Sequence, residues 1–206
     1  KGSKFYLRIG PDETYWEPCS QKAGFHVSFA RVNKDSLVWQ QKLSPFRQEM
    51  EAALAKLIGW PYRTRTVNFK LPEFIDVVLN AGDSRAAFGA TIGQSLPNWG
   101  KVANESRGRT VAMANLYTDP DSLQARREQA QSLLDKSTAS LLRDDAMPGL
   151  LATVLHEATH NLGPSHEYTF MGKTDSQAFG GGLASMLEEL KAQSGALYFL
   201  DLLVKK

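Results

Sequence analysis

The chain has 206 residues, of which 42% are hydrophobic and 22% charged, and its formal net charge is +2 at pH 7. This is the composition of a soluble globular protein, and a charge so close to zero predicts neither a nucleic acid nor another polyanion as a partner. Cys19 is the single cysteine, which excludes a disulfide within the chain, and no apolar run reaches the length of a membrane span. We expect a soluble protein outside the membrane, with the cytoplasm and the periplasm both open as compartments. Nothing in the sequence indicates an oligomeric state.

Short strands are expected mainly in the first half of the chain, at residues 5–9, 25–32, 66–70 and 110–117. Residues 25–32 alternate apolar and polar side chains with period two, which is typical of a half-buried strand. His26 falls on the polar face of that strand, so we expect it to be solvated. Residues 74–79 fit either a helix or a strand.

Helices are expected at residues 45–58, from about 119 to 143, around residues 150–160, and from residue 183 almost to the end. Ser44 and Pro45 predict the start of the first helix, as its N-cap and its first helical position. Residues 81–110 are rich in glycine and predict a long loop, and such a loop in a compact domain is usually functional or mobile.

The most informative stretch is an HExxH motif formed by His156, Glu157 and His160. Apolar residues before it and Gly163-Pro164 after it predict that it lies on a helix. On a helix the two histidines project from one face, one turn apart, so both can bind one metal ion, with zinc expected. Glu157 is then placed to take a proton from a water molecule at the metal. Because such a short match also occurs by chance, two buried core histidines are the alternative interpretation.

A catalytic zinc ion needs a third protein ligand, and the sequence offers two candidates. His166 completes the metzincin pattern HExxHxxGxxH, in which Gly163 turns the chain back toward the metal. A carboxylate from the adjacent pair Glu188 and Glu189, on the next helix, gives instead the two-histidine, one-glutamate set of thermolysin-like enzymes. The short region after His166 shows no convincing methionine turn, which weighs against the metzincin pattern. Spacing alone leaves both candidates open.

Four segments, in their order along the chain, resemble the zinc peptidases of the dipeptidyl-peptidase III family. They are Glu13-Thr14-Tyr15 with residues 21–25, Leu96-Pro97-Asn98, residues 110–116 with Asn115, and the metal motif with Glu188-Glu189-Leu190-Lys191-Ala192-Gln193. Eukaryotic members have HExxxH, so the HExxH of this chain resembles a bacterial-type relative. The family's full-length enzymes extend beyond both ends of this chain, which therefore resembles a catalytic-region fragment or a minimal form.

The resemblance implies roles for individual residues around the metal. It makes Glu189 the third zinc ligand, because the family uses the second glutamate of the pair. Gln193 lies one turn from Glu189 on the expected helix, where it can hydrogen-bond a ligating histidine. Glu188 is also expected to contact a ligating side chain without binding the metal itself.

The resemblance also implies residues that contact the substrate. Tyr15 matches the tyrosine that donates a hydrogen bond to the oxyanion, a contribution of ~2–4 kcal/mol to transition-state stabilisation. Asn98 matches a residue that binds the substrate backbone, and Asn115 is expected to bind substrate as well.

We therefore predict an α+β fold, in which a mainly helical zinc-binding lobe with a gluzincin-like metal site packs against a small β-sheet. Residues 1–206 are expected to form a single catalytic unit, with possible sub-lobes at residues 1–118 and 119–206. The predicted function is hydrolysis of peptide bonds with one zinc ion per chain and Glu157 as the general base. Two alternatives stay open: a metzincin-type endopeptidase that uses His166, and a non-catalytic module that binds zinc or a peptide.

Overall fold

The computed structural model describes residues 4–11, 25–82, 93–96, 109–143, 145–165 and 167–205. The fold is α+β, as predicted, and it forms two compact units. The first unit comprises residues 1–33, 74–92 and 112–151, and the second comprises residues 34–73, 93–111 and 152–206. Each unit combines segments from both sides of residue 118, where the boundary between the possible sub-lobes was expected. That the whole chain forms one catalytic unit stays a prediction.

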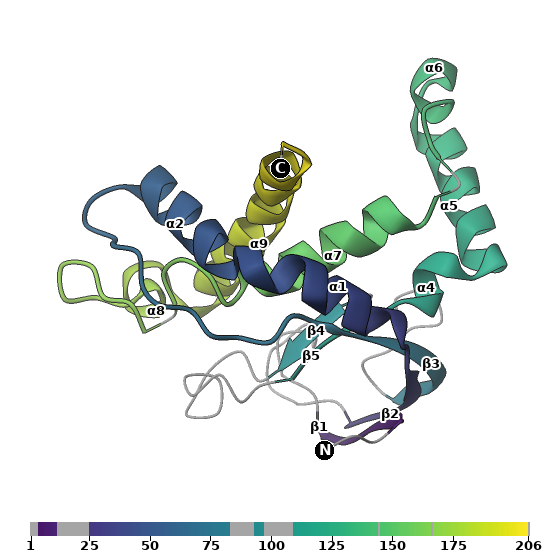
Figure 1. Cartoon of the computed structure of the whole chain (residues 1–206), viewed down its shortest axis with the longest axis horizontal. Helices are drawn as coiled ribbons and strands as arrows, with labels where there is room; N and C mark the ends of the chain where they lie inside the picture. Colours follow the sequence, from purple (N-terminus) through teal and green to yellow (C-terminus); the bar gives the residue numbers. More distant parts are fainter. Residues whose placement is uncertain are drawn as a thin grey trace. The chain divides into compact units, whose positions relative to one another are not determined.

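Five strands form one sheet in the order β1 (Phe5–Pro11), β2 (Phe25–Val32), β3 (Glu73–Gly82), β5 (Arg109–Met113) and β4 (Gly93–Leu96) (Figure 1). β1 pairs with β2 and β2 with β3, both antiparallel, and a bulge interrupts the second ladder between Phe29 and Ala30. β3 shows that residues 74–79 belong to a strand. β4 lies inside the stretch expected to be a loop, and β5 ends at Met113, earlier than the strand expected at residues 110–117.

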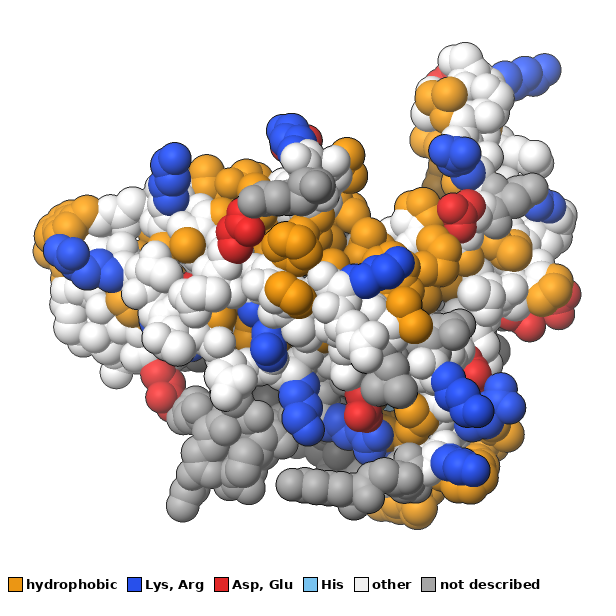
Figure 2. All heavy atoms as spheres, in the orientation of Figure 1, with side chains coloured by type: hydrophobic (Ala, Val, Ile, Leu, Met, Phe, Trp, Pro, Cys, Tyr) orange, Lys and Arg blue, Asp and Glu red, His pale blue; other side chains and the backbone are white. Residues whose placement is uncertain are grey.

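The two faces of β2 are the reverse of those expected. His26 is 1% exposed, whereas Phe25 is 52% exposed, so the prediction of a solvated His26 is wrong. Alternation along a strand separates its two faces, but the core decides which of them is buried. Leu7 of β1 and Leu79 of β3 share the outer face through their pairing with Phe29, and both are exposed. Apolar side chains are accordingly visible at the surface over β1 and β2 in Figure 2.

Helix α1 (Asp35–Leu43), a 3₁₀ turn (Ser44–Phe46) and helix α2 (Arg47–Ile58) follow one another directly. Ser44 has helical dihedral angles and is the C-cap residue of α1, so the prediction of Ser44 as an N-cap is wrong. α1 was not predicted, because no side-chain cap marks its beginning at Lys34.

Residues 66–70 form no strand, contrary to the prediction. Side chains of α2 take the place of a neighbouring strand, since Gln48 accepts a hydrogen bond from the N–H of Val67 and Arg47 donates to the carbonyl of Phe69. Two backbone groups of this segment are thus satisfied by side chains rather than by a ladder.

The helix expected at residues 119–143 is divided. After α4 (Asn115–Thr118), α5 (Pro120–Leu133) ends at Leu134, which is extended, and α6 (Lys136–Ala139) begins anew. Asp135 caps α6 by accepting hydrogen bonds from the N–H groups of Ser137 and Thr138, and a strong N-cap of this kind favours a helix restart.

The last helices are α7 (Met147–Thr159), α8 (Asp175–Phe179) and α9 (Gly181–Val204). α7 and α9 bury a shared apolar core in the second unit: Leu155, Ala158, Leu162, Ala192, Ala196 and Phe199. At Gly195 a Cβ would lie 2.6 Å from Cγ2 of Thr159, so α9 approaches α7 this closely only because residue 195 is glycine. Among the described residues, no helix combines the length and apolar character needed to cross a membrane.

Candidate metal centre

Two helices of the second unit supply the candidate site. α7 carries His156 and Glu157, and His160 follows in the turn after the helix, where its N–H still bonds to the carbonyl of His156 at 3.3 Å. The imidazole rings therefore lie one turn apart, with centroids separated by 5.0 Å and planes at 80°. Facing them, α9 carries Glu188, Glu189 and Gln193.

His156, His160 and Glu189 bring one ligand atom each to within 4.8 Å of one another. Nε2 of His156 lies 3.2 Å from one carboxylate oxygen of Glu189, and Nε2 of His160 lies 3.8 Å from the other. The side chain of Glu189 is 62% exposed, so one side of the cluster faces solvent. Two imidazoles and one carboxylate are a donor set that zinc binds in catalytic sites, and an open side leaves space for a water molecule or a substrate.

The outward nitrogen of each histidine meets an acceptor. Nδ1 of His156 lies 3.2 Å from Oε1 of Gln193, and Nδ1 of His160 lies 2.9 Å from Oε1 of Glu188. In a neutral ring, an acceptor at Nδ1 favours the proton there and leaves Nε2, the nitrogen nearer to Glu189, as the atom that can bind a metal. Both rings can thus adopt the tautomer that a metal ligand needs, and the residues present fit a zinc ion.

The charges of the cluster also favour a cation. A hydrogen bond to Glu189 raises the pKa of His156, and the same contact lowers the pKa of Glu189. Burial works to raise the pKa of Glu188, but hydrogen bonds from His160 and Lys191 outweigh it and the pKa is lowered. Both carboxylates are therefore ionised at neutral pH and provide the negative charge that a divalent cation needs.

Glu157 lies beside the cluster and is 6% exposed. Burial raises its pKa to about 7, against the opposing effect of His160 and His156. A Cβ at Gly93 would lie 2.5 Å from Oε1 of Glu157, so the backbone of β4 passes directly over this carboxylate and only glycine permits it. In the sequence Gly93 was one glycine among several in a loop-like stretch, with no local signal to single it out.

Of the remaining predicted site residues, the structure describes only Asn115. Asn115 belongs to the first unit, where its side-chain amide donates to the carbonyl of Val77 and accepts from the N–H of Val77, both at 2.9 Å. These two hydrogen bonds hold the start of α4 against β3, and a role of Asn115 in substrate binding stays a prediction. Tyr15, Asn98 and His166 lie outside the described residues.

No protein-family model matches the chain, and no curated protein matches it in sequence. Two solved structures match it over 100% of its length. One is dipeptidyl-peptidase III from Caldithrix abyssi, with a TM-score of 0.77 and 20% identity, of which the match covers 38%. The other is dipeptidyl-peptidase III from Corallococcus sp. strain EGB, with a TM-score of 0.71 and 26% identity, of which the match covers 37%. The predicted resemblance is thus confirmed in the fold of the whole chain, which spans less than two fifths of each of these proteins.

Proposed function

We propose that the chain is the zinc-binding part of a peptidase similar to dipeptidyl-peptidase III. The observation that carries the proposal is the convergence of His156, His160 and Glu189 beside the buried carboxylate of Glu157. The shared fold supports it, since both solved structures described above are dipeptidyl-peptidase III. The proposed substrate is a peptide, and the proposed cofactor is one zinc ion per chain.

Each residue has a separate task in this proposal. His156 and His160 bind the metal through Nε2, and Glu189 binds it through its carboxylate. When bound, a zinc ion supplies a Lewis acid that polarises the peptide carbonyl and makes water more acidic. Glu157 is not a ligand; it accepts the proton of the attacking water and passes it to the leaving amine.

The edge of β4 offers the peptide a place to bind. β4 is the last strand in the order of the sheet, so one of its edges has no strand partner among the residues that the structure describes. An extended peptide can add to such an edge through main-chain hydrogen bonds. Because Gly93 lies against Glu157, a peptide paired with β4 runs close to the proposed general base. Tyr15 as a donor to the oxyanion, and Asn98 and Asn115 as peptide contacts, belong to the same proposal.

Metal content tests the ligand set. We expect one zinc per chain by elemental analysis of the purified protein, and loss of that zinc in Glu189→Ala. His166→Ala is the matched comparison and should keep its zinc. If Glu189→Ala keeps the metal and His166→Ala loses it, the site is of the metzincin type; if the parent protein binds no zinc, the proposal fails.

A second candidate is a non-catalytic module that binds zinc or a peptide. The similarity leaves room for it, because the match covers only 38% and 37% of the two similar proteins and the shared fold alone does not carry their activity to this chain. Incubation of the zinc-loaded protein with a peptide library, read by mass spectrometry, separates the two candidates. Cleavage products that disappear with a chelator support the peptidase, whereas one zinc per chain without any cleavage supports the module.

A further inference from the structure

The loop that follows the metal-binding helix, residues 161–164, is fixed by long side chains from other segments. Its carbonyl groups accept hydrogen bonds from two cations, because Arg65 donates to Asn161 at 2.8 Å, and Lys191 to Leu162 at 3.1 Å and to Pro164 at 3.2 Å. Arg65 follows α2 in the chain and Lys191 lies on α9. A turn held from two directions in this way has little freedom to move.

The third side chain that supports loop 161–164 is a carboxylate inside the protein. Glu51 of α2 is 0% exposed, and its Oε2 accepts the N–H of Gly163 at 2.8 Å. Its Oε1 accepts the hydroxyl of Tyr62 at 2.7 Å and the N–H of Arg65 at 3.3 Å. A buried carboxylate is costly unless its oxygens are hydrogen-bonded, and both oxygens of Glu51 are.

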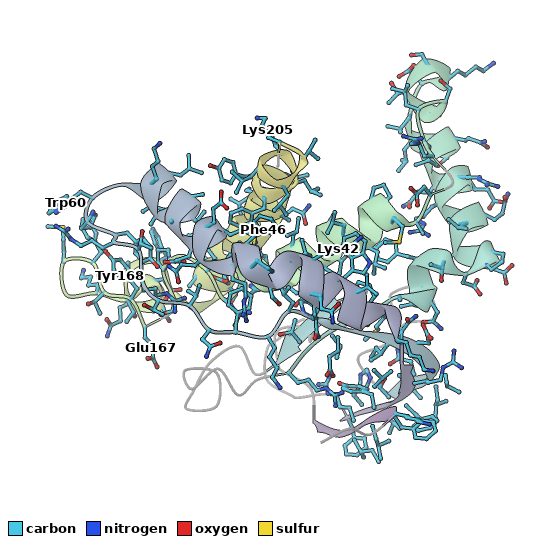
Figure 3. The ribbon with its side chains drawn as sticks, viewed as in Figure 1. Lys42, Phe46, Trp60, Glu167, Tyr168 and Lys205 are labelled. Atoms are coloured by element: carbon cyan, nitrogen blue, oxygen red, sulfur yellow. The ribbon has the colours of Figure 1, made fainter. Side chains whose placement is uncertain are left out.

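Gly163 has a backbone conformation and close packing that favour glycine at this position. Gly163 has φ of +69°, and a Cβ there would lie 2.8 Å from Cδ2 of Leu54, one turn along α2 from Glu51. The ring of Tyr62 also makes an edge-to-face contact with the ring of Tyr168, with centroids 5.4 Å apart. Tyr168, which is labelled in Figure 3, lies further along the same connection. α2 and the residues that follow it thus set where the chain runs after His160.

The loop is connected to a histidine of the cluster by two side chains. Besides the loop carbonyls, the ammonium of Lys191 binds Oε2 of Glu188 at 2.9 Å. The other oxygen of Glu188 lies 2.9 Å from Nδ1 of His160. The position of loop 161–164 therefore determines where Lys191 holds Glu188, and Glu188 determines how the ring of His160 is turned.

We propose that Glu51 is a positioning residue for the metal site. Its carboxylate fixes loop 161–164 and, through Lys191 and Glu188, the orientation of His160. The inference rests on the proposed function, since it takes His160 as a ligand, but Glu51 itself contacts neither the metal ligands nor a substrate.

Glu51→Gln tests the inference with little change in shape. A carboxylate accepts hydrogen bonds on both oxygens, but a carboxamide accepts on one and presents N–H groups on the other side. Either the N–H of Gly163 or the two donors at Oε1 then lose their acceptor. Tyr62→Phe is the matched control, because it removes one donor to Glu51 and keeps both the ring contact with Tyr168 and the bond from Gly163.

Two readouts distinguish positioning from stability alone: zinc affinity by competition with a chelator, and the absorption spectrum of the cobalt-substituted protein. We expect Glu51→Gln to bind zinc about tenfold more weakly than the parent and to shift the cobalt bands. Tyr62→Phe should lower the melting temperature but leave zinc affinity and the cobalt bands as in the parent. A folded Glu51→Gln protein with the zinc affinity and cobalt bands of the parent would overturn the inference.

Lys191→Met provides a second test if Glu51→Gln does not fold. It keeps most of the length of the side chain but has no ammonium group to hold the loop carbonyls or Glu188, so zinc affinity should again fall about tenfold. Unchanged affinity in Lys191→Met removes the connection on which the inference depends. If the parent protein binds no zinc, the proposed function fails together with the inference, whereas a zinc-binding parent with unaffected variants overturns the inference alone.

Discussion

At the residue scale, the proposed function gives Glu157 and the histidines on either side of it different tasks. Glu157→Gln should keep its zinc, because Glu157 is not one of the three residues whose ligand atoms converge. Peptide hydrolysis should fall by about 10²–10⁴-fold, the usual contribution of a general base. Elemental analysis and a cleavage assay on the same sample provide the two measurements.

His156→Ala is the control for that experiment, since it should lose zinc and activity together. Peptide cleavage at the parent rate by zinc-loaded Glu157→Gln would exclude Glu157 as the base.

Because of Tyr62, the stability of the fold should fall at alkaline pH. Burial, together with the hydrogen bond to Glu51, raises the pKa of Tyr62 from 10.0 to about 12. The folded protein thus holds the phenolic proton more tightly than the unfolded chain does. Its stabilising effect, roughly 2–3 kcal/mol, is present below about pH 10 and is lost as the pH rises through the folded pKa.

Tyr62→Phe has no phenolic proton to lose. Urea denaturation at several pH values should show that the parent loses more free energy of unfolding than this variant between about pH 10 and about pH 12. Equal losses in the two proteins would contradict the assignment of this pH dependence to Tyr62.

At the scale of elements, the distance between α7 and α9 brings Glu189 to the histidines. Gly195→Ala forces its new methyl group against Thr159, so we expect a loss of about 1–3 kcal/mol in the free energy of unfolding and weaker zinc binding. Gly182→Ala is the matched control on the same helix, because a Cβ there meets nothing within 4 Å. It should leave zinc affinity unchanged and leave the stability equal or higher. The same zinc affinity in both variants would show that the spacing of the helices does not control the site.

Patterns within one element predicted the parts of the fold that depend on local spacing. The HExxH helix and the long C-terminal helix follow from apolar periodicity and helix-stop signals, and α7 and α9 lie where these were expected. Two of the predictions that were wrong concern contacts with other segments. The buried face of β2 is set by what packs on it, and residues 66–70 have strand-like side chains but bond to α2.

In the candidate site, too, local patterns identified some residues and missed those whose contacts are distant in the sequence. A local spacing identified His156, His160 and Glu157, and similarity to a family indicated Glu189. No local pattern could single out Gly93 or Glu51, because their importance lies in contacts with residues distant in the sequence. Lys191 lay inside a motif taken from the family, but its hydrogen bonds to Leu162 and Pro164 depend on how α9 meets the loop.

At the scale of the molecule, the residues that converge on the metal site come from one of the two compact units. His156, His160 and Glu189 all lie within residues 152–206 of the second unit, whereas β1, β2 and all but the first residue of β3 belong to the first. A ligand that binds only the folded state stabilises the part of the structure that forms its site, by ~2.7 kcal/mol at a free concentration 100 times its dissociation constant. Zinc should therefore stabilise the second unit more than the first.

Hydrogen–deuterium exchange with zinc and with a chelator measures this inequality. We expect zinc to slow exchange of the backbone amides of α9 and of residues 152–165, and removal of the metal to restore it. Amides of β1 and β2 should exchange at the same rate in both conditions, because no residue of these strands belongs to the metal-binding cluster. In His160→Ala the effect of zinc on α9 should be lost. Slower exchange throughout both units on adding zinc would instead show that they unfold together, so that the binding energy of the metal stabilises the whole chain.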